Sequence, residues 1–271
     1  MAKGNDGNYF QHSIEVVLAK HLADSDCRGR LHVAFAHAMA PFEVCDEPIR
    51  GQCRNLLLTS LCRSSAAEQA DEPRIVSAYR ATAATLCHYP NSCELLRGTI
   101  GAKRLSGGAT EMDSGKFGQL ARAWAGSDIR VANSSWRGQL LGDGVLACPS
   151  RLARLGAPWL FSLDPMTYSE NGPQDDDKVY RADLAKLAGA FRAYVGSGWP
   201  GVGAVFVYAV RPKWRAAFWR FAGCLASLSG TSLAGFWHTH QGGNRNLVAL
   251  FLSGLELPED FPPAGIFAGQ D

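Results

Sequence analysis

The segment LFSLDPMTY, residues 160–168, joins an apolar run to groups that can do chemistry. The Asp164 carboxylate and the Pro165 carbonyl are hydrogen-bond acceptors, and Tyr168 offers an aromatic face. Two such acceptors can accept hydrogen bonds from both N–H groups of an amino group and so localise its nitrogen lone pair. An aromatic ring can stack on the nucleobase that carries the amino group. We therefore interpret Asp164, Pro165 and Tyr168 as candidate catalytic residues. The alternative for Asp164 is a loop acid or helix cap at the end of a strand.

Strands and helices alternate along the chain, which decides where such residues can meet. Apolar β-prone runs predict strands at residues 30–39, 106–113, 128–135, 158–165 and 201–210. Apolar positions at helical spacing predict helices at 12–24, 93–100, 114–126, 148–156, 178–195 and 212–228. The last two runs, 231–240 and 246–254, are typical of an antiparallel hairpin.

This alternation predicts an α/β fold with a mostly parallel sheet covered on both faces. Five strands and a terminal hairpin fit the Rossmann-like, seven-stranded sheet of methyltransferases that use S-adenosylmethionine (SAM). We expect one domain over 1–271, with a helical insertion at 45–95 after the first strand. Ligands bind at the carboxyl ends of parallel strands, so the candidate positions are His37, Glu111, Ser135 and Asp164.

Composition narrows the class of protein. The 271 residues are 46% hydrophobic and 19% charged with a net charge of +2, a globular profile that neither demands nor excludes a nucleic-acid partner. The eight cysteines form no Cys-x-x-Cys pair and, with the histidines, match no closed zinc pattern, so we predict no metal site. The first residues hold no apolar run and no stretch could span a bilayer, so we expect a cytoplasmic protein with no membrane partner.

Several short motifs carry a family resemblance over most of the chain. They are Gly4-Asn5 with Gln11-His12, the run FAHAMAP at 35–41, Tyr89-Pro90-Asn91-Ser92, Thr110-Glu111 and Asp164-Pro165. Together they resemble the bacterial 23S ribosomal RNA adenine-N6 methyltransferases of the J type. That resemblance implies SAM as the cofactor and an adenine amino group in RNA as the target.

The resemblance also implies cofactor-binding positions. They are Gln11, His12, His37, Ala38, Ser92, Glu111, Ser135 and Trp136. Glu111 would accept hydrogen bonds from both ribose hydroxyls, and its alternative is a surface glutamate that caps the next helix. Ser135 would hold the adenine amino group. Trp136 would either stack on adenine or pack the sheet edge, and Ser92 would bind the SAM carboxylate or only cap a helix.

The chain departs from the family pattern at several of these positions. Phe35 stands where the family has an acid, Gln11 where it has a lysine, and Met39 and Pro41 where it has glycines. Met166 replaces the second proline after Asp164. A catalytically altered or inactive protein that binds SAM or a nucleoside, as a partner or sensor, is therefore an alternative. An enzyme that uses SAM on a small molecule is another.

Overall fold

The computed structural model describes about half of the chain. The described residues are 6–36, 92–140, 144–146, 156–163, 167–169, 178–180, 182–183, 185–187, 189, 203–210, 231–240, 244–253 and 256. All structural statements below concern these residues. The predicted insertion at 45–95 lies outside them except for 92–95, and so do the predicted helices at 212–228 and, but for its last residue, at 148–156.

A seven-stranded sheet in the order β3-β2-β1-β4-β7-β9-β8 forms the centre of the structure. Its strands are β1 (Leu31–Ala36), β2 (Leu105–Thr110), β3 (Asp128–Ala132), β4 (Trp159–Leu163), β7 (Gly203–Val210), β8 (Thr231–His240) and β9 (Asn244–Ser253). The first five of that order pair in parallel, whereas β9 runs antiparallel to both β7 and β8. The prediction of a parallel α/β sheet followed by an antiparallel hairpin is confirmed.

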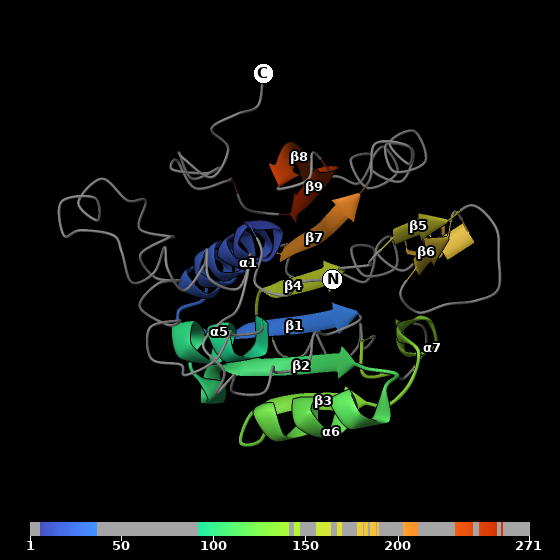
Figure 1. Cartoon of the computed structure of the whole chain (residues 1–271). Coiled ribbons are helices and arrows are strands. Elements are labelled where there is room, and N and C mark those ends of the chain that lie inside the picture. The colour runs from blue at the N-terminus through green and yellow to red at the C-terminus, as the bar shows by residue number, and fades with distance from the viewer. Residues whose placement is uncertain are drawn as a thin grey trace, which may run out of the picture.

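Helix α1 (Asp6–Asp24) covers the middle of the sheet and contacts β1, β4, β7 and β8. Figure 1 shows it on the same face as α5 (Ser92–Ile100), with which it packs. The α1 residues Val17, Leu18 and Leu22, at helical spacing, are at most 2% exposed. Every residue of β1 and β4 is buried, as expected for central strands covered on both faces.

Strand β2 has a glycine pair that lets neighbouring backbone approach closely. Gly107 has a φ of +138°, and a Cβ there would lie 1.8 Å from the carbonyl oxygen of Val33. A Cβ on Gly108 would lie 2.0 Å from the carbonyl oxygen of Val145. No side chain fits at either position, so β1 and the segment 144–146 can lie directly against the β2 backbone.

Three short elements depart from the predictions. Strand β3 ends at Ala132, before the predicted end at 135, and helix α7 (Trp136–Leu140) follows where no element is predicted. Strands β5 (Thr167–Ser169) and β6 (Lys178–Tyr180) form a separate parallel pair. The predicted helix at 178–195 is therefore wrong at its start, since helical residues begin only at 182. Val179 and Tyr180, β-branched and aromatic, favour a strand there.

Candidate active site

The carboxyl ends of four parallel strands meet at one edge of the sheet. Ala36 of β1 lies beside Leu163 of β4, and Thr110 of β2 lies beside Ala132 of β3. Figure 1 shows β5, β6 and α7 beyond this edge, in the direction in which the arrows of β1, β2 and β4 point. We call this region the carboxyl edge; of the predicted site residues that follow these strands in the sequence, the described ones are Glu111 and Ser135.

Glu111 is the best defined polar residue at the carboxyl edge. It directly follows β2 and is 5% exposed. Its Oε1 accepts a hydrogen bond of 2.9 Å from the Asp113 backbone N–H, and no other described residue bonds to the carboxylate. Each carboxylate oxygen can accept more than one bond, so Glu111 keeps capacity for two hydroxyl donors.

The cap of the following helix is Asp113, not Glu111. Asp113 precedes α6 (Ser114–Ala123), and its Oδ1 accepts the Lys116 backbone N–H at 2.9 Å. That hydrogen bond lowers the pKa of the Asp113 carboxyl. The alternative interpretation of Glu111 as a surface helix cap is therefore wrong, because Glu111 is buried and the capping position is occupied.

The Asn133 side chain ties the turn after β2 to the end of β3. With its amide nitrogen turned toward the backbone, it donates to the carbonyl oxygens of Glu111 and Met112, each at 3.0 Å. Its amide oxygen then accepts from the Ser114 hydroxyl at 3.2 Å. The backbone N–H of Glu111 also donates to Ala132 at 3.0 Å. The backbone around Glu111 is thus held from both sides.

The two serines after β3 have different environments. The Ser135 hydroxyl accepts the Arg137 backbone N–H at 3.3 Å, so this residue begins α7 as a cap. The Ser134 hydroxyl oxygen is buried and has no hydrogen-bond partner in the described part of the chain. An unpaired buried hydroxyl costs about 1–3 kcal/mol, which makes Ser134 a polar group at this edge that sequence reasoning missed.

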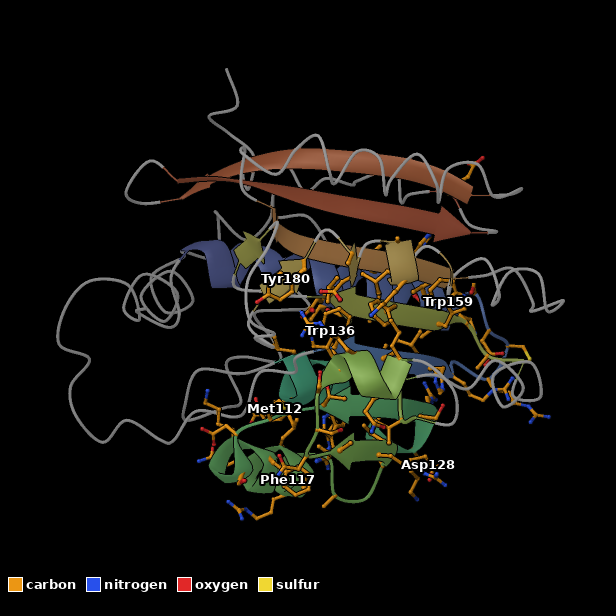
Figure 2. All side chains as sticks on the ribbon, turned by 90° about the vertical axis from the view of Figure 1, so that its right-hand side faces the viewer. Met112, Phe117, Asp128, Trp136, Trp159 and Tyr180 are labelled. Carbon is orange, nitrogen blue, oxygen red and sulfur yellow. The ribbon has the colours of Figure 1, made fainter. Side chains whose placement is uncertain are left out.

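Trp136 packs inside the protein. Its side chain is among the largest fully buried ones, and the Arg137 guanidinium lies 4.6 Å from its ring centroid. The Arg137 guanidinium also lies 5.3 Å from the ring of Tyr180, and Figure 2 shows Trp136 and Tyr180 near each other. This burial favours the packing alternative for Trp136 over stacking on adenine.

Arg137 forms a buried ion pair across the carboxyl edge. Its Nε lies 3.1 Å from both carboxylate oxygens of Asp183, and its second terminal nitrogen lies 2.9 Å from Asp183 Oδ2. Asp183 Oδ2 also accepts the Tyr180 backbone N–H at 2.8 Å. The partners are 46 residues apart in the sequence, so no local motif could have indicated the pair.

At the end of β1 the structure has an aromatic pair in place of an acid. Phe35 is 4% exposed, and its ring stacks on Trp124 with centroids 6.1 Å apart. The Trp124 Nε1–H is buried and has no partner among the described residues. Phe35 therefore belongs to the core, and the position where the resemblance implies a carboxylate supplies none.

One buried carboxylate on α1 contacts the strand that leads to Asp164. Glu15 is 1% exposed, and its Oε1 accepts a short hydrogen bond from the hydroxyl of Ser162 in β4. Ser162 lies next to Leu163, the last residue of β4. This contact links α1, which also carries Gln11 and His12, to the carboxyl end of β4.

The remaining predicted site residues are described in part or not at all. Asp164, Pro165, His37 and Ala38 lie outside the described residues. Gln11 and His12 lie in α1, Ser92 begins α5 and Tyr168 is the middle residue of β5, but only the backbone of these four is described. Their roles stay predictions.

Met112 is a further residue that sequence reasoning missed. It follows Glu111 at the carboxyl edge and is 53% exposed, the one exposed large hydrophobic side chain in the described part of the chain. Figure 2 shows it near α6, on the opposite side from Asp128. An apolar side chain beside a buried carboxylate suits a ligand with both apolar and hydroxyl groups. Its place directly after the predicted ribose-binding acid was the available signal.

The described residues contain neither a cluster of metal ligands nor a membrane-spanning helix. No group of three or more histidine, cysteine, aspartate or glutamate side chains in these ranges is arranged to hold a metal ion. No helix within the same ranges is both long and apolar enough to cross a membrane.

Comparison with solved structures supports the fold. No protein-family model and no curated protein sequence matches the chain. Protein LPL1258 from Legionella pneumophila, of family DUF519, aligns with a TM-score of 0.62 and 12% identity over 96% of this chain and 89% of its own. At this identity the likeness concerns the fold alone.

Weaker likenesses include methyltransferases. An rRNA methylase from Streptococcus thermophilus gives a TM-score of 0.34 and 9% identity over 59% of this chain and 79% of its own. A precorrin-6y C5,15-methyltransferase from Geobacter metallireducens gives 0.31 and 9% over 80% and 94%. Scores this low carry no argument about function. The sheet order and the likeness to LPL1258 define an α/β fold in which a parallel sheet is extended by an antiparallel hairpin.

Proposed function

We propose that the protein is a SAM-dependent methyltransferase that acts on an amino nitrogen, of the adenine-N6 type, in RNA. The observation that carries the proposal is the buried Glu111 carboxylate at the end of β2. A carboxylate held in place by backbone contacts costs little to reorganise when hydroxyl donors arrive. It lies at the strand edge where open α/β sheets bind ligands.

The residues present fit the cofactor in part. Glu111 would hold the ribose hydroxyls, and exposed Met112 would contact the flat face of the adenine. Ser134 would accept the adenine amino group, since the Ser135 hydroxyl already accepts an N–H from α7. When bound, SAM supplies an electrophilic methyl group. Gln11, His12, His37, Ala38 and Ser92 remain candidates for its amino-acid end.

The target amino group would be prepared by the turn after β4. The Asp164 carboxylate and Pro165 carbonyl would accept its two N–H bonds, which localises the nitrogen lone pair. Tyr168 would stack on the base. Met166 separates Pro165 from Thr167 and Tyr168, so the aromatic residue comes later than in the resembled family. RNA is the proposed partner and the cytoplasm the proposed location.

A second candidate function is binding of SAM or a nucleoside without methyl transfer. The Phe35–Trp124 pair favours this function, because Phe35 stands where the resembled family has an acid beside the cofactor and its ring packs on Trp124 instead. A protein of this kind would act as a sensor or as the partner of another protein. Methyl transfer to a small molecule is a variant of the first function with a different acceptor.

Calorimetric titration with SAM and S-adenosylhomocysteine, followed by transfer of a tritiated methyl group to transcribed 23S ribosomal RNA, tests the proposal. Micromolar binding together with labelled RNA would support it. Binding without transfer to RNA or to small amines would support the second candidate. Absence of binding at millimolar ligand would refute both.

A further inference from the structure

We propose that Arg137 is a positioning residue: its ion pair with Asp183 holds the β5–β6 pair, and with it Tyr168, at the carboxyl edge. The role of Tyr168 in catalysis rests on the proposed function. The holding of β5–β6 does not, and it can be tested without a substrate.

The ion pair is built to fix geometry. The Arg137 side chain is 11% exposed and that of Asp183 is 6% exposed, so water screens their attraction little. The guanidinium contacts both carboxylate oxygens at 2.9 to 3.1 Å, which sets the direction as well as the distance of approach. Breaking such a pair leaves a buried charge without its counter-charge, which strongly opposes separation.

Two aromatic rings restrict the guanidinium further. It lies 4.6 Å from the Trp136 centroid and 5.3 Å from the Tyr180 centroid. Trp136 and Tyr180 are 2% and 7% exposed, so neither ring can turn away without opening the core. Lysine could keep the charge at this position but could provide neither the planar fork nor the stacking surface.

The strand register carries this restraint to the candidate catalytic segment. Ser169 pairs with Tyr180, and Tyr168 pairs with Val179. Because Asp183 also accepts the Tyr180 backbone N–H, β6 is bound to the ion pair through its last residue. Arg137 lies in α7, the helix that follows β3 in the sequence. The ion pair thereby connects α7, which follows β3, to β5 and β6, which follow β4 in the sequence.

The chain offers a matched control in a second Arg–Asp pair. Asp26 and Arg30 are four residues apart just before β1, with Arg30 33% exposed. They meet through nitrogen–oxygen distances of 3.0 Å, as close as in the Arg137 pair. These contacts join two residues of one turn, which is not part of β5 or β6. Its loss should not affect β5 or β6.

Hydrogen exchange on the full-length chain tests the holding of β5–β6. Asp183→Asn and Arg137→Lys should speed exchange of amides in 167–169 and 178–180 at least about tenfold, while β1 and β2 keep their rates. Asp26→Asn should leave the β5 and β6 rates unchanged. Unchanged β5 and β6 rates in both site variants, or an equal rise through the whole sheet, would overturn the proposal. Arg137→Lys serves if Asp183→Asn does not fold.

The effect on catalysis is tested by measuring kcat and the Kd for SAM separately. With transcribed 23S ribosomal RNA, both site variants should lower kcat about tenfold and change the Kd for SAM by less than about threefold. An unchanged kcat with fast-exchanging β5 and β6 would overturn the positioning role. A wild-type chain that transfers no methyl group would refute the proposed function. The exchange experiment would then still test whether the Arg137–Asp183 pair holds β5 and β6 in place.

Discussion

The two ends of the parallel strands carry polar residues of different kinds. At the amino ends, polar groups pair within a turn or between neighbouring strands: Asp26 pairs with Arg30 four residues away, and His32 Nδ1 of β1 lies 3.1 Å from the Ser106 hydroxyl of β2. At the carboxyl ends, Arg137 reaches Asp183 across 46 residues, and Glu111 is buried with acceptor capacity left over. We expect the polar groups at the amino ends to add stability to their own surroundings and those at the carboxyl ends to serve the proposed site.

The largest effect should follow from changing the acid after β4. Asp164→Ala removes an acceptor of the target N–H, so methyl transfer should fall about 10²–10⁴-fold with SAM affinity and stability little changed. Tritium incorporation and calorimetry on the same preparation measure both. Unaltered turnover would exclude Asp164 from the mechanism and leave the carboxyl edge without its proposed catalytic group.

Glu111→Gln should have the next largest effect. The amide keeps the size of the side chain but loses one acceptor oxygen and the charge, so affinity for SAM should fall about 10- to 100-fold. Calorimetric titration measures this fall. Asp128→Asn, at the exposed amino end of β3, is the control and should bind SAM as the wild type does. Equal affinity of wild type and Glu111→Gln would remove the residue that carries the proposed function.

Asp26→Asn should affect stability and should do so in a pH-dependent way. The Arg30 guanidinium lowers the pKa of Asp26 to about 2, so its contribution is full above the ordinary aspartate pKa and is lost as pH falls toward 2. Allowing for solvent screening, the free energy of unfolding of the variant should be about 1 kcal/mol lower than that of the wild type at pH 6. At pH 2 the two free energies should be nearly equal.

Urea unfolding of both chains across this pH range measures the difference, and SAM titration at pH 7 checks function. A constant difference between the two chains at all pH values would contradict the role of the carboxylate charge. A change in SAM affinity would contradict the expectation that residues at the amino ends of the strands contribute to stability but not to binding.

The smallest effect should come from Ser106→Ala, which removes the hydrogen bond to His32. The expected cost is about 1 kcal/mol in the free energy of unfolding, with no change in SAM affinity. Chemical denaturation and calorimetry measure the two quantities. A loss of SAM affinity without a loss of stability would show that the amino end also takes part in binding.

Elements of regular length could be predicted from the sequence, and contacts between distant residues could not. The strands containing Phe35 and Phe161 were evident because a central parallel strand is apolar along its whole length. Strand β6, only three residues long, lies next to helical residues, and its pattern merges with theirs. Glu111 was identified because one carboxylate at a strand end is a local signal.

The environments of Trp136 and Glu15 could not be predicted from the sequence, for a different reason. Whether Trp136 stacks on a ligand or packs in the core depends on Tyr180, which lies near it only in the folded chain. The burial of Glu15 depends in the same way on Ser162 in β4. Amphipathic spacing in α1 marks which residues face the sheet, but it cannot show that a carboxylate among them has a partner there.

The exposure of Met112 makes this residue a built-in chemical reporter of the carboxyl edge. Met112 is 53% exposed, and mild peroxide should convert its thioether to the sulfoxide, which adds one oxygen to the mass. A molecule seated against Glu111 would cover the neighbouring sulfur and slow that oxidation. Mass spectrometry of the peptide containing residue 112 could therefore rank cofactors, analogues and RNA fragments by the protection they give, before any substrate is known.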